Sequence, residues 1–319
     1  MEKIILFSEE PKLLFELISA GEEIKKKKEV NITCVVCGIK DDEIINKIAS
    51  TNIDKVIVAE NELLEKYAYS IDLYVDALEQ IIRKENPQLF IASSTKRGRE
   101  ITARLAARLD WGAATDCNKV YVENGDLFVE RVVFGGKCIA KEKIKQYPFA
   151  VSILPGKYEP ASPAEKKAEV QRIKVELKEP KTKIIERKSK EIAGPRLEEA
   201  ELIVSVGRGL KSKEDLKMIE ELAKTINAVI GCSRPLSADY GWFPTWVGLS
   251  GVKVRPKVYF AIGISGAIQH VAGITDAKII VAINKDENAP IFEVCDYGIV
   301  GDLYEVVPKL IEELRKMKK

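Results

Sequence analysis

Histidine is almost absent from this sequence: His270 is the only one among 319 residues. A metal site built on paired histidines is therefore not expected, and no metal site is predicted. Cysteine offers little more, since six are present and only Cys34 and Cys37 lie close together, in the apolar run NITCVVCG. No second pair completes a ligand set, so we interpret these two as buried thiols in a strand. A redox pair or half of a metal site is the alternative.

An excess of one charge is also lacking, because 51 basic residues face 49 acidic ones and the net charge is +2. Nucleic-acid-binding surfaces are usually strongly basic, so no nucleic-acid partner is expected. No apolar run is long enough to span a bilayer, and an apolar strand (KIILF) begins at once, with no signal-like segment before it. These features predict a cytoplasmic protein.

The first part of the chain alternates short β-branched runs with amphipathic stretches of helical period. Strands are predicted at residues 3–9, 31–38, 55–60 and 89–95. Helices are predicted at residues 11–24, 41–51, 71–87 and 96–110. Such alternation is typical of a parallel sheet whose strands are joined by helical crossovers.

A different pattern follows in residues 118–154, where short strand-like runs are separated by turn residues. Asn124-Gly125 and Gly135-Gly136 are hairpin turn signals, so this segment predicts an antiparallel meander. Residues 155–200 are rich in Pro, Lys and Glu and contain one more alternating run, VQRIKVELKE. The stretch 181–200 is predicted to be a linker.

A second α/β unit is predicted after that linker. Its strands are expected at residues 201–207, 228–231, 257–263, 278–284 and 291–298. Its helices are expected at residues 213–226, 266–270 and 302–317. The sequence thus predicts two α/β domains, 1–187 and 188–319, each a mostly parallel sheet flanked by helices. The first has an added antiparallel meander and the second is Rossmann-like.

Unusual residues gather at the predicted carboxyl ends of the strands in the second domain, where open α/β sheets bind ligands. The first group is GRGLKS, residues 207–212. Its glycines allow a phosphate to approach the backbone, Arg208 adds a positive charge, and Ser212 with Asp215 forms a capping box for the next helix. The group is an incomplete dinucleotide fingerprint, because Ser212 stands at the third glycine position.

The second group, GISGAIQH at residues 263–270, follows a strongly apolar strand and opens a short helix. This arrangement favours an anionic group at the start of the helix. A lone helix histidine is more often structural than functional. The place of His270, one turn beyond a glycine-rich strand end, favours a role in a site.

Three more groups complete the pattern. Arg234, in CSRP, follows a predicted strand and needs an anion, a ring face or water, with an interdomain ion pair as the alternative. WVGLSG, residues 246–251, is a glycine loop with one hydroxyl, and its tryptophan is expected to pack in the core or loop rather than stack on a ligand. Asn284 and Asp302 are polar residues expected in the same crevice, although Asp302 is equally explained as a helix N-cap.

Hydrolytic and acyl-transfer machinery is missing from the sequence. There is no nucleophile elbow, no Walker lysine loop and no Ser/His/Asp set supported by its context, so no catalytic residue is predicted. The remaining residues suit a large phosphate-bearing cofactor that performs its own chemistry while the protein tunes it.

The same residues carry a resemblance to a known family. The stretch VYFAIGISGAIQHVAGITDAKIIVAINKDENAPIFEVCDYGIVGDLYEVVP resembles the signature of electron-transfer flavoprotein α subunits, the ETF alpha/FixB family. VGRGLKS and GCSRP precede it in the order that the family shows. The resemblance is close over about residues 200–310 and looser in the N-terminal domain, where the order of elements agrees.

This resemblance implies a heterodimer in which residues 1–187 dock a β subunit and residues 188–319 form a DHS-like domain that binds FAD. The implied function is that of a redox electron carrier rather than a stand-alone enzyme. It would shuttle electrons from donor dehydrogenases, such as acyl-CoA dehydrogenases, to a membrane-associated quinone oxidoreductase or another acceptor. A subunit of a flavin-based electron-bifurcating complex is the alternative within the family.

The resemblance also implies roles for single residues. Arg234 would lie against the isoalloxazine ring, Ser250 would bond near its N5 atom, and His270 would reach its carbonyl edge. Asn284 and Asp302 would hold the adenosine side. The complete set of implied FAD contacts is Arg208, Ser233, Arg234, Val247, Gly248, Leu249, Ser250, Ser265, Gly266, Ala267, Ile268, Gln269, His270, Asn284 and Asp302.

The glycine loop departs from the family's Gln-rich form, VGQTG. Leu249 replaces an amide side chain and Ser250 replaces a threonine, which leaves the choice between simple transfer and bifurcation open. A self-sufficient flavin or NAD oxidoreductase would need an acid/base residue that is not evident. A regulatory module that binds AMP or NAD would leave Arg234, Ser250 and His270 without a purpose. Residues 95–99, TKRGR, are interpreted as a basic helix start or subunit contact, with a phosphate loop as the alternative.

Overall fold

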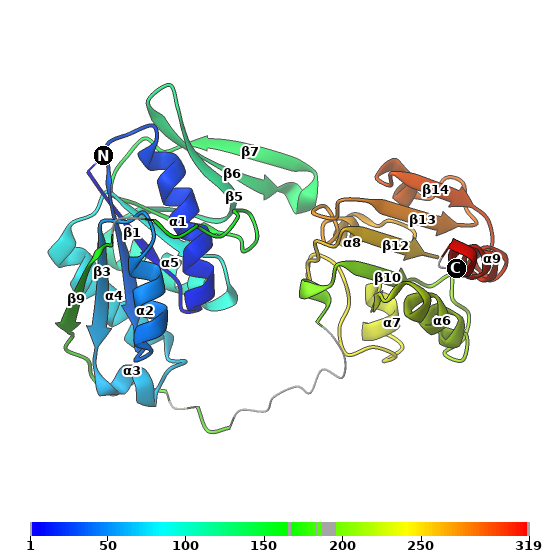
Figure 1. Ribbon diagram of the computed structural model, residues 1–319, viewed down its shortest axis with the longest axis horizontal. Helices are drawn as coiled ribbons and strands as arrows, with labels where there is room; N and C mark the ends of the chain where they lie inside the picture. The colour runs from blue at the N-terminus through cyan, green and yellow to red at the C-terminus, as the bar shows by residue number, and fades with distance from the viewer. Residues whose placement is uncertain (1, 165–166, 183, 187–195, 318–319) are drawn as a thin grey trace. The chain divides into compact units, whose positions relative to one another are not determined.

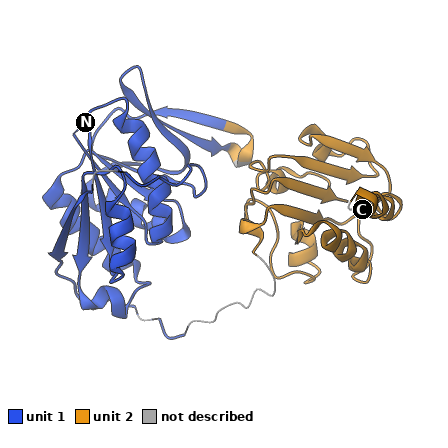
Figure 2. Ribbon diagram, viewed as in Figure 1, with its two compact units in different colours: residues 1–133, 139–187 blue, residues 134–138, 188–319 orange. Residues whose placement is uncertain are grey.

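The computed structural model describes residues 2–164, 167–182, 184–186 and 196–317 of the chain (Figure 1). These residues form two compact units, which Figure 2 shows in different colours. The first comprises residues 1–133 and 139–187, and the second comprises residues 134–138 and 188–319. Half of the predicted linker, 181–200, falls outside the described residues, which resume at Arg196.

The first unit is built on one sheet, with the strand order β7-β6-β5-β8-β4-β1-β2-β3-β9 in the described part of the chain. Its strands are β1 (Lys3–Phe7), β2 (Asn31–Cys37), β3 (Lys55–Glu60), β4 (Leu89–Ser93), β5 (Gly112–Glu123), β6 (Asp126–Val133), β7 (Cys138–Lys143), β8 (Phe149–Ile153) and β9 (Glu169–Lys174). Its helices are α1 (Pro11–Lys25), α2 (Asp42–Ala49), α3 (Glu62–Lys66), α4 (Ile71–Glu85) and α5 (Lys96–Leu109). Strands β1 to β4 pair in parallel, as the sequence predicted.

Helices cover both faces of this sheet, and each face carries its own core because successive side chains of a strand point to opposite faces. Ile4 and Leu6 of β1 point into a core that includes residues of α1 and α2. Ile5 and Phe7 point into a second core, to which α4 and α5 contribute. Cys34 and Cys37 are buried in β2, as the sequence predicted, and burial raises the pKa of the Cys37 thiol to about 12.

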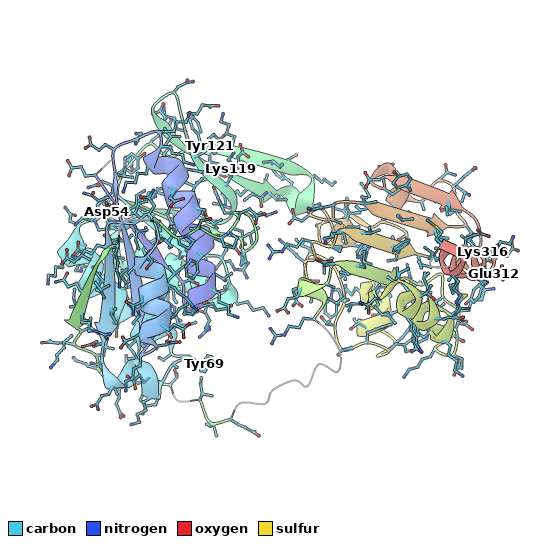
Figure 3. The ribbon with its side chains drawn as sticks, in the orientation of Figure 1. Asp54, Tyr69, Lys119, Tyr121, Glu312 and Lys316 are labelled. Atoms are coloured by element: carbon cyan, nitrogen blue, oxygen red, sulfur yellow. The ribbon has the colours of Figure 1, made fainter. Side chains whose placement is uncertain are left out.

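The predicted meander is partly wrong. Strands β5 and β6 do form an antiparallel hairpin, which turns at Asn124-Gly125. Tyr121 and Lys119, labelled in Figure 3, lie on β5, and the Tyr121 ring stacks on Phe128 of β6 with centroids 5.9 Å apart. Strand β8, however, runs parallel to β4 and to β5, because its apolar residues extend the buried parallel sheet. Two further elements join the unit. Strand β9 pairs parallel to β3 and overlaps the alternating run VQRIKVELKE. The short helix α3 was not predicted from the sequence.

The second unit has a parallel sheet with the strand order β11-β10-β12-β13-β14. Its strands are β10 (Leu202–Val206), β11 (Val229–Cys232), β12 (Val258–Ile262), β13 (Ile280–Asn284) and β14 (Tyr297–Val300). Its helices are α6 (Leu216–Ile226), α7 (Arg234–Ala238), α8 (Ile268–Val271) and α9 (Leu303–Met317). Helices α6 and α9 pack on one face of the sheet, and loop residues such as Val254 and Ile274 cover the other.

The expected strand at 291–298 is wrong. Residues Pro290–Glu293 form a 3₁₀ turn, and the strand comes later, as Tyr297–Val300. Pro290 at the first position of that turn and the buried side chain of Ile291 account for the turn. The strand that follows is exposed along its whole length, so it lacks the alternation by which a half-buried strand is recognised.

Candidate functional site

The chain leaves β10 toward β11 on one side and returns to β12 on the other, which makes the carboxyl ends of β10 and β12 the topological switch point of the second sheet. Ligands of doubly wound sheets bind at such points. A cavity of about 660 Å³ lies there, a size typical of small-molecule sites. Its lining comes from the segments that follow β10, β11, β12 and β13 and from the start of α9.

Nearly all of the residues predicted from the sequence line this one cavity. They are Arg208, Ser233, Arg234, Val247, Gly248, Leu249, Ser250, Ser265, Ala267, Gln269, His270, Asn284 and Asp302. Gly266 and Ile268 are not part of the lining. Gly266 instead shapes the segment, because its φ is +85° and a Cβ added there would lie only 2.2 Å from the Ile291 nitrogen, which leaves no space for a side chain.

The glycines after β10 also have a structural role that the sequence did not predict. A Cβ on Gly207 would lie 2.3 Å from the carbonyl oxygen of Gly263, and one on Gly209 would lie 2.8 Å from the Gly263 Cα. These glycines therefore allow the two segments that leave β10 and β12 to touch backbone to backbone. Where the two segments meet they form part of the cavity wall, since Gly209 and Gly263 both line the cavity.

Positive charge dominates the cavity wall. Arg208, Lys211, Arg234 and Lys285 line it, and none of the four makes an ion pair with any described residue. Asp302 is the only carboxylate among the described residues of the lining. Unpaired guanidinium and ammonium groups around a concave site favour an anionic ligand such as a pyrophosphate.

Two of the predicted polar residues are already engaged within the protein. The Asn284 amide donates from Nδ2 to the Ile264 carbonyl (2.9 Å), and its Oδ1 accepts from the Asp286 N–H (3.0 Å). Asp302 Oδ1 accepts from the Tyr304 N–H (2.9 Å), so Asp302 does cap α9, in addition to facing the cavity. Asn284 and Asp302 thus fix the segments on either side of the site.

The predicted capping box is only half present. Asp215 Oδ2 accepts from the Ser212 N–H (3.0 Å), but no side-chain bond caps α6, which begins at Leu216. The sequence placed the helix start too early, because the residues before Leu216 form a turn in the structure. The consequence is that Asp215 holds the loop after β10 rather than the helix.

His270 is buried at 6% exposure, and its Nε2 lies 2.9 Å from the hydroxyl oxygen of Tyr259, which is fully buried in β12. Its Nδ1 atom is buried and makes no hydrogen bond of normal geometry within the described residues. Burial lowers the pKa of His270 to about 4, an effect that the backbone of Val247 only partly offsets. The imidazole is therefore neutral near pH 7, and it can offer an N–H to a ligand but no positive charge.

The glycine loop after α7 is anchored at both ends. The Val247 N–H donates to the Cys232 carbonyl (2.9 Å), and the Leu249 N–H donates to the Gln269 carbonyl (2.7 Å). A Cβ added to Gly248 would lie 2.8 Å from that same Gln269 oxygen, so the loop approaches α8 closely. Leu249 and Ser250 remain exposed on the cavity side.

The cavity is also lined by Tyr304, Lys211 and Lys285, which were not predicted from the sequence as site residues. Lys285 follows directly on Asn284, and Lys211 lies in the segment that contains Arg208, so their position after a strand was an available signal. Tyr304 lies two residues beyond Asp302 in the first turn of α9, where no sequence pattern distinguishes a site residue from a packed one.

In the described parts of the chain, no group of three or more His, Cys, Asp or Glu side chains is placed to bind a metal ion. Among the helices that the structure describes, none is long and apolar enough to cross a bilayer.

Comparison with known proteins places these features in a family. Residues 11–178 match the electron transfer flavoprotein domain, and residues 196–275 match the electron transfer flavoprotein FAD-binding domain. The second match includes the ends of β10, β11 and β12, so the cofactor of the second unit is FAD.

Relatives of known name agree over almost the whole chain. The electron transfer flavoprotein subunit alpha of Bacillus subtilis is 37% identical over 305 residues, which cover 95% of this chain and 93% of the relative. Protein FixB of Clostridium saccharobutylicum is 36% identical over 315 residues, with 96% and 92% covered. The acryloyl-CoA reductase electron transfer subunit beta of Anaerotignum propionicum is 34% identical, with 95% and 92% covered. The chain belongs to the electron transfer flavoprotein alpha subunit family, which includes the FixB proteins, and its role is electron transfer.

Proposed function

We propose that the cavity at the carboxyl ends of β10 and β12 holds FAD and that the chain works as one half of a heterodimer. In this proposal residues 188–319 hold the cofactor and residues 1–187 dock a β subunit. Bound FAD supplies the electron-carrying chemistry. One observation carries the proposal: four Arg and Lys side chains that form no ion pair with a described residue line the same cavity as several hydroxyls and a buried neutral imidazole.

The residues present fit the cofactor's chemistry. The buried Nδ1 of His270 has no partner of normal geometry among the described residues, so a ligand acceptor would satisfy it. The Ser233 hydroxyl is largely buried and makes no hydrogen bond to a described residue, which leaves it available as a donor. Arg208 and Lys211 on the same wall suit the pyrophosphate.

The resemblance to the family suggests roles for the remaining residues. Arg234 faces the ring system, Ser250 donates a hydrogen bond to its edge, and Val247 to Leu249 form the wall beside it. Ser265, Ala267, Gln269 and His270 lie around the cofactor. Asn284 and Asp302 hold the two segments at the adenosine end. Because His270 is neutral, the positive charge beside the ring comes from Arg234.

The proposed electron route runs from donor dehydrogenases, through this flavin, to a membrane-associated quinone oxidoreductase or another acceptor. Among the described residues that line the cavity, Asp302 is the only carboxylate, and it already caps α9, which supports a carrier rather than a stand-alone oxidoreductase. A carrier needs the protein to tune the potential and to exclude water, and not to move substrate protons.

The test is to co-express the chain with a β subunit, purify the complex, and record its visible spectrum during stepwise dithionite reduction. A yellow heterodimer that bleaches reversibly supports the proposal. A complex that is colourless, and stays colourless after incubation with FAD, would overturn it. A yellow complex that turns over NADH without any partner protein would instead identify a self-sufficient oxidoreductase.

A further inference from the structure

A small network of hydrogen bonds connects α9 to the loop after β10, at the edge of the FAD cavity. The Tyr304 hydroxyl donates to Asp215 Oδ2 (2.7 Å) and accepts from the Lys211 N–H (2.8 Å). The same carboxylate oxygen accepts from the Ser212 N–H (3.0 Å). Three bonds thus hold Lys211 and Ser212, which follow Arg208 and Gly209 in the cavity wall.

Both ends of this network stay in the protonation state that it requires. The bond from Tyr304 holds the pKa of the Asp215 carboxyl below its usual range, so Asp215 is an anion. Burial and the neighbouring Asp215 carboxylate raise the pKa of Tyr304, so its hydroxyl keeps its proton. Hydrogen bonds to an ionised group are stronger than those between neutral groups, which makes this a firm anchor.

The ring of Tyr304 has a second contact with the same loop. The Lys211 ammonium lies 5.0 Å from the ring centroid, within the range of a cation–π interaction. Lys211 makes no ion pair with a described residue, and both it and Tyr304 line the cavity. The hydroxyl therefore fixes the Lys211 backbone while the ring restrains its side chain.

We propose that Tyr304 is a positioning residue that holds the Arg208–Ser212 loop and the Lys211 ammonium ready for the phosphate end of FAD. This inference rests on the proposed placement of FAD in the cavity. Tyr304 acts on affinity, because it preorganises cations that would otherwise lose conformational freedom on binding. It leaves the reduction potential unchanged, because Arg234 and His270 come from other strand ends and take no part in the network.

The chain offers a matched pair of variants. Tyr304→Phe removes the hydroxyl but keeps the ring beside Lys211. Tyr297→Phe makes the same chemical change on β14, where Tyr297 is 65% exposed and outside the cavity lining. Full-length protein, co-expressed with its β subunit and stripped of flavin, is titrated with FAD at low and high salt, and the potential of the reloaded protein is then measured.

Tyr304→Phe is expected to raise the Kd for FAD about three- to tenfold, the effect of losing a hydrogen-bonded anchor. Tyr297→Phe should leave the Kd unchanged, and both variants should keep the wild-type reduction potential. In a Lys211→Gln background the effect of Tyr304→Phe should shrink, because part of it acts through the Lys211 charge. If Tyr304→Phe fails to assemble, Asp215→Asn tests the same anchor from its other end.

Wild-type FAD affinity in both Tyr304→Phe and Asp215→Asn would overturn the inference while leaving the FAD site intact. A shift in potential as large as the change in affinity would also overturn it, because Tyr304 would then act on the flavin ring. If the wild-type complex itself binds no FAD, the proposed function fails, which is a different and distinguishable result.

Discussion

Lowering the pH from about 7 to about 4 should destabilise the second unit, because His270 must then take up a proton in a buried position. The pKa of His270 is lowered from 6.5 to about 4 by burial. Between those two values the unfolded chain binds a proton that the folded chain does not bind. Stability from this group is therefore fully present above pH 6.5 and is lost as the pH falls toward 4. The difference amounts to about 3 kcal/mol at pH 4.

The assay uses the fact that the chain has one histidine and three tryptophans. Trp111 lies in the first unit, and Trp242 and Trp246 lie in the second, so a Trp111→Phe background reports unfolding of the second unit. Urea unfolding of this protein is compared with its His270→Gln derivative between pH 7 and pH 4. Other groups titrate in both proteins, so the difference between the two free energies isolates His270.

Direct titration gives an independent value. The single histidine gives one Cε1–H resonance by NMR, and the midpoint of its titration is expected near pH 4, not near 6.5. A midpoint near 6.5, or free energies of unfolding that change in parallel with pH in the two proteins, would refute the reasoning. His270 would then be solvated, and its charge would contribute to the site near neutral pH.

Three further perturbations address other parts of the site. Arg234→Ala should lower the first reduction potential of the bound flavin, because a positive charge is lost beside the ring. The shift should be tens of millivolts, since Arg234 is exposed and solvent screens its charge. Arg234→Lys should change the potential less, and a redox titration measures both. Asp302→Ala should lower the free energy of unfolding by about 1 kcal/mol through loss of the α9 cap, and Asp302→Asn should preserve it; equal losses in a urea titration would argue against the cap. Gly266→Ala should abolish FAD retention, because its Cβ would lie 2.2 Å from a backbone nitrogen, while Gly241→Ala, with φ +66° and open space around it, should retain FAD. Retention in both would show that the segment can shift.

Much of the architecture follows from local pattern. Strands β1 to β4 and the helices between them, apart from α3, were predictable, because a strand buried on both faces is a continuous apolar run bounded by amphipathic helices. The pairing direction of β8 was not predictable in this way. Residues 149–153 form a short apolar run after a hairpin, and only their pairing with β4 in the folded sheet determines that they run parallel.

The location of the site was also available from the sequence, because glycines, cations and hydroxyls follow successive strands of one sheet. The hydrogen bonds within the site were not available from the sequence. The bond from Tyr304 to Asp215 joins residues 89 positions apart, and the bond between Tyr259 and His270 depends on how β12 faces α8. Such contacts depend on tertiary packing and leave no periodic trace in the chain.

The central claim, that this cavity holds FAD, is tested most directly by reversing one charge inside it and one outside it. Arg208 lines the cavity, whereas Arg255 is exposed in the same unit and lies outside the lining. Flavin-free protein carrying Arg208→Glu or Arg255→Glu is titrated with FAD, and binding is followed by flavin fluorescence. The account predicts that Arg208→Glu loses most of its affinity and Arg255→Glu binds as the wild type does. Equal affinity in the two variants would contradict the placement of FAD in this cavity.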